Sequence, residues 1–139
     1  MKNMVIELSD LTKDFGNHRG IFDVNLSVEE GEVFGYLGPN GAGKTTTIRH
    51  LMGFLRPDAG ECRMFGQDCF TNAAQIGEKR GYLAGEPVFF SDLTGEQYLE
   101  FTAGLRRMKS RKRMHELMEL FEISRIGPVH KMSNGMRQN

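Results

Sequence analysis

Residues 38–46 read GPNGAGKTT, and this short stretch decides how the rest of the chain is interpreted. It fits the pattern Gly-x-x-x-x-Gly-Lys-Ser/Thr, whose fixed positions are Gly38, Gly43, Lys44 and Thr45. From the chain's own composition, a chance match has a probability of about one in a hundred. The apolar run EVFGYLG (32–38) precedes the pattern and KTTTIRHLMGF (44–54) follows it, so a buried strand, a glycine loop and a helix are predicted in that order.

These residue types suit a loop that binds phosphate. Glycines allow several consecutive N–H groups to point into one concavity, and the helix that starts near Lys44 adds its positive end. Lys44 supplies a mobile charge for the outer phosphates, and the Thr45 hydroxyl is a ligand of the kind that Mg²⁺ shares with phosphate oxygens. The alternative is a glycine-rich turn with an incidental lysine. The sequence therefore predicts a site for a nucleoside triphosphate with magnesium, formed by Gly38, Pro39, Asn40, Gly41, Ala42, Gly43, Lys44, Thr45 and Thr46.

Strands are predicted on both sides of this loop. Residues 4–8 and 22–28 are short and apolar, and the second alternates Phe22, Val24, Leu26 and Val28 with polar residues. This alternation indicates an antiparallel sheet with one face in water. Residues 61–65 and 80–83 are further strands, the latter short and buried.

The sequence changes character after Pro87 and becomes helical. Thr94 and Gln97 have the spacing of a capping box, and an apolar stripe runs from Tyr98 to Leu105. The next helix carries an apolar face that is most simply core and less simply a docking surface, made of Met114, Leu117, Met118 and Phe121.

Composition excludes several classes of function. Acidic and basic residues balance at 18 each, so no global field favours DNA or an anionic membrane. The amino-terminal residues MKNMVIELSD meet an acid before any long apolar stretch, so no signal peptide is expected. Cys62 and Cys69 fit no metal or disulfide pattern and are interpreted as free thiols.

The loop GPNGAGKTT together with KMSNGMRQ (131–138) resembles the ATP-binding subunit of an ABC transporter, over essentially the whole chain. The resemblance implies an α/β fold of the P-loop NTPase class, with an antiparallel β-subdomain and a helical subdomain. It divides the chain into a nucleotide-binding core at 1–86 and a helical subdomain at 87–139. It also places Phe15, in LTKDFG, where the family has an aromatic side chain that stacks on adenine.

The same resemblance identifies Ser133, Asn134 and Gly135 as the family's signature. In the family these residues lie at a helix N-terminus and contact the γ-phosphate of ATP held by a second subunit in a head-to-tail dimer. Asn134 departs from the usual glycine and brings a side chain close to that phosphate. The alternative role for Ser133, a helix N-cap, is compatible with the functional one.

A second departure is Gly85, where the family usually has a glutamine or glutamate that holds magnesium and the attacking water. Gly85 has no side chain for this role, and it makes the loop flexible. Residues 87–130 match the helical subdomain, and 88–94 is the stretch expected to contact the transmembrane permease.

The family's general base and switch histidine follow the signature, and Asn139 ends this sequence before them. We therefore assign no catalytic residue in the chain, and expect an amino-terminal fragment that binds ATP but hardly hydrolyses it. Strands that the family places between 32–38 and 80–83 would be missing, which predicts open sheet edges and a poorly soluble or domain-swapped species.

The predicted function is thus ATP binding and hydrolysis coupled to transport, on the inner face of the cell membrane through the permease, with no nucleic acid partner. The alternative is a nucleotide-binding regulatory or interaction module without catalysis. A soluble member of the family that works on ribosomes or DNA ranks last. The basic run RRMKSRKR (106–113) is more simply a solvated face than a contact to nucleic acid or lipid.

Overall fold

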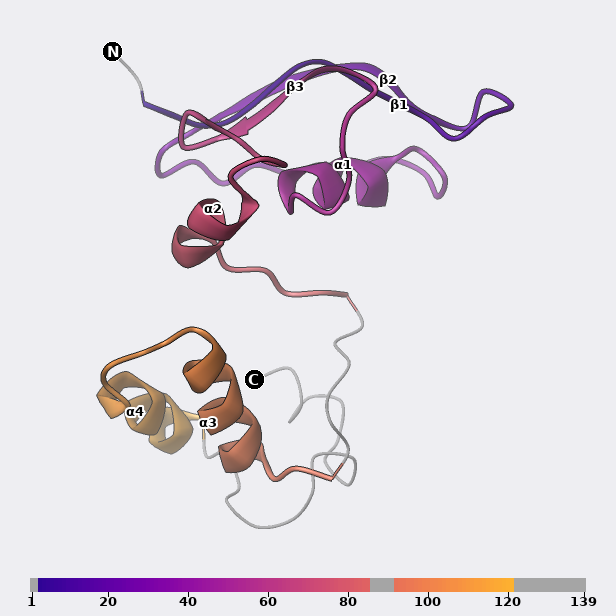
Figure 1. The fold of residues 1–139 in the computed structure, drawn as a ribbon. Coiled ribbons are helices and arrows are strands. Elements are labelled where there is room, and N and C mark those ends of the chain that lie inside the picture. Colours follow the sequence, from indigo (N-terminus) through magenta and orange to yellow (C-terminus); the bar gives the residue numbers. More distant parts are fainter. Residues whose placement is uncertain (1–2, 86–91, 122–139) are drawn as a thin grey trace. The chain divides into compact units, whose positions relative to one another are not determined.

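The computed structural model describes residues 3–85 and 92–121. The chain divides into two compact units, Met1–Gly81 and Tyr82–Asn139, and each is described here by itself. Among the described residues, the first unit contains all of the strands and two helices, and the second contains two helices (Figure 1).

The first unit is built on a four-stranded antiparallel sheet with the order β2-β1-β3-β4. The sheet confirms the predicted antiparallel pairing of the first two strands, and both strands extend beyond the predicted ranges. Its strands are β1 (Met4–Asp14), β2 (Gly20–Glu29), β3 (Ala59–Met64) and β4 (Gln67–Asp68).

A bulge in β2 changes which side chains face the core. Val24, Leu26 and Val28 are at least partly buried, as the alternation predicts, but Phe22 is exposed and Ile21 is 4% exposed in its place. Between the pairs Leu11↔Val24 and Lys13↔Ile21, two residues of β2 lie opposite one residue of β1, and Asp23 has a φ of 51°. The extra residue reverses the alternation, so the prediction for Phe22 was wrong.

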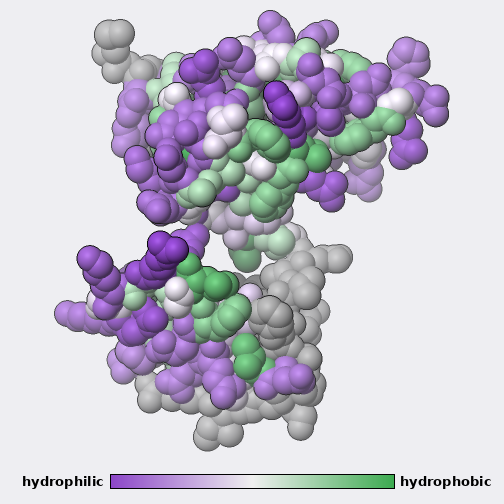
Figure 2. All heavy atoms as spheres, viewed as in Figure 1, coloured by the Kyte–Doolittle hydropathy of each residue, from purple (hydrophilic) through white to green (hydrophobic). Residues whose placement is uncertain are grey.

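Helices α1 (Lys44–Leu51) and α2 (Ala73–Lys79) complete the first unit. Residues from β1, β2, β3 and α2 form one core, with Leu51 of α1 packed against it. In Figure 2, hydrophobic residues gather on the side of the first unit where α1 and α2 lie. The buried members of the core are Leu8, Leu11, Ile21, Cys62, Met64, Cys69 and Ile76. Both cysteines are free thiols, as expected.

Two predicted strands are absent from the described part of the chain. Residues 32–38 and 80–83 have no strand structure, and Val33 and Leu37 are 100% and 93% exposed. The physical reason is pairing, because a strand needs a neighbour for its N–H and C=O groups. No described strand lies beside either segment. The apolar composition predicted buried strands, and for both segments this prediction was wrong.

The second unit contains α3 (Gly95–Leu105) and α4 (Lys112–Leu120). The predicted capping box is confirmed, because the Thr94 hydroxyl accepts from the Gln97 N–H at 3.2 Å and the Gln97 side chain accepts from the Thr94 N–H at 2.9 Å. Ala103, Met114 and Met118 form the core, which bears out the interpretation of the methionine face as core. Phe121, at its end, is exposed.

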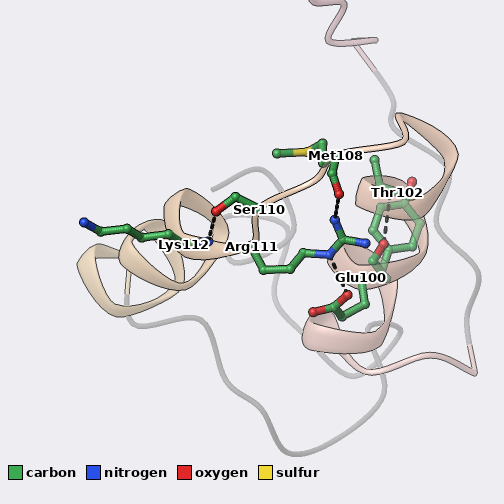
Figure 3. A network of polar contacts seen from close by, with 7 residues as sticks. Glu100, Thr102, Met108, Ser110, Arg111 and Lys112 are labelled. Carbon is green, nitrogen blue, oxygen red and sulfur yellow. Dashed lines mark hydrogen bonds and ion pairs between the residues drawn. The ribbon is translucent and has the colours of Figure 1, made fainter.

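An ion pair joins the middle of α3 to the start of α4 (Figure 3). Arg111 Nε donates to the Glu100 carboxylate at 2.9 Å, and the same guanidinium donates to the Met108 carbonyl. The basic run is therefore partly paired with an acid rather than wholly solvated. In the described part of the chain, no helix is long and apolar enough to span a bilayer.

Candidate nucleotide-binding site

The predicted phosphate loop leads directly into α1. The Ala42 N–H donates to the Pro39 carbonyl at 3.2 Å, which closes a turn, and Gly41 and Gly43 both have a φ of 86°. Gly43 is the N-cap of α1 and provides no side-chain cap for the helix. The first N–H groups of α1 have no carbonyl one turn earlier, so they are left to interact with an anion.

Gly43 packs directly against the first sheet hairpin. A Cβ atom at this position would lie 2.3 Å from Ile21 Cγ2 and 3.6 Å from the Gly20 carbonyl oxygen. No such conflict exists at Gly41, where a Cβ would have nothing within 4 Å. The loop can approach the start of β2 this closely only because residue 43 has no side chain.

Lys44 turns back over the loop. Its ammonium group donates to the Pro39 carbonyl at 2.7 Å and also to the Gly38 carbonyl. The charge is therefore held beside the concavity by neutral acceptors, not by a carboxylate. A bound anion would compete for the Lys44 ammonium with two neutral carbonyl groups. These hold the ammonium less strongly than a carboxylate would.

The loop and the β1–β2 turn enclose a cleft of about 560 Å³. Of the predicted site, the cleft is lined by Phe15, Asn40, Gly41, Gly43, Lys44, Thr45 and Thr46. Gly38, Pro39 and Ala42 belong to the same loop but do not line the cleft. The structure thus brings Phe15 to the loop, although more than twenty residues separate them in the sequence. Sequence reasoning missed three further lining residues, His18, Arg19 and Gly20.

Helix α1 is fixed at both ends behind the cleft. The Thr47 hydroxyl donates to the Gly43 carbonyl at 3.2 Å and lies 3.3 Å from the Tyr36 hydroxyl. At the other end, the Arg80 guanidinium donates to the carbonyls of Leu51 and Met52, at 2.5 and 3.2 Å. A cation at the C-terminus of a helix satisfies its last carbonyls and its dipole.

His50, on the same helix, is 1% exposed, and its ring contacts the backbone of Thr46. Its Nδ1 lies 2.8 Å from the Thr46 carbonyl oxygen, so Nδ1 carries the proton and donates. Its Nε2 has no partner in the described structure. The buried ring thus links Thr46, in the first turn of α1, to the last turn of the helix.

The donor set of the cleft fits a magnesium ion that arrives with phosphate. In the described part of the chain, no group of three or more His, Cys, Asp or Glu residues is placed to hold a metal. Among the cleft-lining residues, Thr45 and Thr46 supply hydroxyl oxygens and none is acidic. Because Mg²⁺ takes few protein ligands and completes its shell with phosphate and water, these hydroxyls are oxygen ligands of a kind that it uses.

The remaining predicted positions are less informative. Gly85 is exposed, with open space where a Cβ would lie. Ser133, Asn134 and Gly135 lie outside the described residues, as do Phe89 and Phe90 of the expected permease contact.

Comparison with known proteins agrees with this geometry. The family model described as ABC transporter matches residues 21–139. The chain is 34% identical to the bacitracin transport ATP-binding protein BcrA of Bacillus licheniformis over 136 residues, which is 96% of this chain and 44% of that protein. The chain therefore spans less than half the length of this relative.

Solved structures show the same fold. A structure titled as the ATP binding subunit of an ABC transporter aligns with a TM-score of 0.83 at 28% identity, over 96% of this chain and 58% of that one. The structure of cbiO1 from Clostridium perfringens, described as part of the ABC transporter complex cbiONQ, aligns with a TM-score of 0.79 at 23% identity, over 99% of this chain and 59% of that one. With the family model matching most of its length, the chain belongs to the ATP-binding proteins of the ABC transporter family.

Proposed function

We propose that residues 38–46 bind the triphosphate of ATP together with Mg²⁺. The observation that carries this proposal is the cleft itself, which joins a glycine loop, an uncapped helix N-terminus and the Lys44 ammonium without an acidic residue in its lining. Such a cleft favours a multiply charged anion over any neutral ligand.

Each part of the cleft has a role in this proposal. The backbone N–H groups of the loop cradle the phosphates, and Lys44 moves from the carbonyls of Gly38 and Pro39 to the outer phosphates. Thr45 ligates the magnesium ion, which neutralises phosphate charge when bound. The Phe15 ring, 55% exposed at the rim of the cleft, stacks on adenine.

For the whole protein we propose ATP binding and hydrolysis that drive transport across a membrane. The printed roles of BcrA in bacitracin transport and of cbiO1 as part of a transporter complex support this proposal. The partners are a transmembrane permease, which holds the subunit at the inner face of the cell membrane, and a second ATP-binding subunit. In that head-to-tail dimer, Ser133, Asn134 and Gly135 contact the partner's ATP. The functional division runs between a core at 1–86 and a helical subdomain at 87–139.

One observation favours a second candidate, a nucleotide-binding module without catalysis. Gly85 is exposed and has no side chain to orient water or a metal ion. Phosphoryl transfer relies on several groups that position the reactants at once, and we assign no general base among residues 1–139. The two candidates share ATP binding and differ in turnover.

Calorimetric titration of the purified chain with ATP and Mg²⁺ tests ATP binding, which both candidates share. Lys44→Ala is expected to weaken binding about tenfold or more, because it removes the charge from the phosphate site. Lys109→Ala is the matched control, since Lys109 is exposed in the second unit and outside the cleft. Equal affinities for wild type and Lys44→Ala would refute the proposed site. Release of phosphate above the uncatalysed rate would then exclude the module without catalysis.

A further inference from the structure

The turn that connects β1 to β2 has an unusual backbone. The Arg19 N–H donates to the Gly16 carbonyl at 3.1 Å, and the two central residues, Asn17 and His18, have φ angles of 53° and 55°. This is the left-handed region, which residues other than glycine visit at a cost. A turn with two such residues fits the twist of a hairpin, and here neither residue is a glycine.

Both sides of the turn are fixed. The Phe15 N–H donates to the Arg19 carbonyl at 2.7 Å, and the Gly16 N–H donates to the Asp14 carboxylate at 2.7 Å. Asp58 in turn accepts from the Asp14 N–H at 3.0 Å and from the Lys13 ammonium at 2.6 Å. The turn is therefore held in one conformation, with Phe15 and Arg19 opposite each other across it.

Arg19 lies next to the residue that packs on the phosphate loop. The Gly20 carbonyl faces Gly43 at the start of α1, and Arg19 precedes Gly20 directly. Arg19 and Lys44 both line the cleft, and the Arg19 side chain is exposed with no ion pair in the described structure. The cleft thus contains a second cation whose guanidinium is available to a ligand.

We infer that Arg19 is a ligand-positioning residue whose guanidinium binds the α-phosphate of the nucleotide. The inference rests on the proposed function and assigns a further contact within that site. Arg19 lines the cleft with both groups: its carbonyl accepts from the N–H of Phe15, whose ring takes the base, and it precedes Gly20, whose carbonyl lies beside Gly43 of the loop that takes the outer phosphates. The phosphate nearest the base is the one that this position reaches. A guanidinium is suited to it because its fork of donors binds two phosphate oxygens together.

The test compares Arg19→Gln with wild type for ATP, ADP, AMP and adenosine, each competing against a fluorescent ATP analogue. Arg19→Gln is expected to weaken ATP, ADP and AMP by the same factor, about tenfold, because all three contain the α-phosphate. Adenosine should bind both proteins equally. Arg19→Lys should recover part of the loss, because it keeps the charge without the fork. Arg56→Gln is the matched control, since Arg56 is exposed in a loop outside the cleft.

The outcomes separate the inference from the function on which it rests. If wild type binds no nucleotide, the proposed function fails. If wild type binds and Arg19→Gln has unchanged affinities, only the inference fails. A loss confined to ATP would place the guanidinium at the γ-phosphate, and an equal loss for adenosine would place it at the base or ribose, so either result overturns the assignment. Thermal unfolding of Arg19→Gln should match wild type, which excludes a loss through misfolding.

Discussion

Gly43 shows how one residue determines whether the phosphate loop can form. Its φ of 86° is unfavourable for a residue with a side chain, and its backbone lies against Ile21 and Gly20, where a Cβ atom would collide with Ile21. Gly41 has the same φ and open space around it. The two glycines therefore separate the cost of the backbone conformation from the cost of the packing.

We expect Gly41→Ala to lower the free energy of unfolding by about 1–2 kcal/mol, the cost of a left-handed residue with a side chain. Gly43→Ala should lower it by about 2–5 kcal/mol, because overpacking against Ile21 adds about 1–3 kcal/mol. Urea denaturation of both variants measures the difference. Equal losses for the two variants would mean that the contact between the loop and β2 is not formed in solution.

At this scale the sequence predicts local structure well and long-range contacts poorly. The hypothesis for Lys44 and Thr45 comes from an eight-residue pattern, and both residues line the cleft. Phe15 was identified only through a family resemblance. Arg19 carries no local signal of its own, and its position in the cleft follows from the packing of Gly20 on Gly43, which no pattern within the turn reports.

Asp68 organises the connection between β4 and α2. Its carboxylate accepts from the N–H groups of Phe70 and Thr71, at 3.1 and 2.8 Å, and from the Thr71 hydroxyl at 2.8 Å. The hydrogen bond from the Thr71 N–H has the largest effect and lowers the pKa of Asp68. Burial opposes it, and hydrogen bonds from the Thr71 hydroxyl and the Phe70 N–H keep the pKa below its usual value. The contact is therefore made by the charged form.

The stability that Asp68 contributes should be present above pH about 4, the usual pKa in an unfolded chain, and be lost as the pH falls through the lower folded value. Asp68→Asn should be less stable than wild type at pH 7, and the difference should shrink as the pH approaches 3. Urea midpoints at several pH values measure this. Glu78→Gln, on the exposed face of α2, is the control. A difference that stays constant with pH would contradict the role given to the carboxylate.

Helix α3 depends on the capping box at its start. Thr94→Ala removes the hydroxyl that accepts from the Gln97 N–H, and should cost about 1 kcal/mol. Hydrogen exchange of the amides in the first turn of α3 measures the loss in the second unit directly. Thr94→Ser keeps the hydroxyl and should protect these amides as wild type does. Equal exchange in the alanine and serine variants would show that the cap contributes nothing.

The elements show which part of the fold the sequence determines locally. The capping box and the helix after the glycine loop were predicted because each depends only on residues that are close together in the sequence. Residues 32–38 were wrongly predicted as a strand, because an apolar run indicates burial but does not supply the neighbouring strand that forms the hydrogen bonds. The bulge at Asp23 was not predicted, since it depends on the opposite strand.

At the scale of the whole molecule, the described surface includes large apolar side chains that water covers. Val33 and Leu37 are almost fully exposed, and Leu83 is 73% exposed. Large apolar side chains that stay in water are of the kind that another segment or molecule covers. The sequence predicted these segments as buried strands, and the structure shows neither the burial nor the strand backbone.

We expect these 139 residues, prepared alone, to bind a hydrophobic dye and to associate as the concentration rises. Replacing Val33 and Leu37 together with serine should reduce both effects, because it removes the two most exposed large apolar side chains of the described residues. Dye fluorescence and light scattering provide the measurement, with Leu120→Ser in the second unit as the control. A monodisperse monomer that unfolds cooperatively and binds no dye would count against this expectation.

The central claim is that the loop of residues 38–46 is where this protein binds the phosphates of ATP. An NMR titration of the chain with a non-hydrolysable ATP analogue and Mg²⁺ tests it most directly, because backbone amides report contact with phosphate residue by residue. We predict the largest shifts at the amides of Gly41, Gly43, Lys44 and Thr45, and their disappearance in Lys44→Ala. Saturable shifts centred elsewhere, with these amides unchanged, would contradict the account.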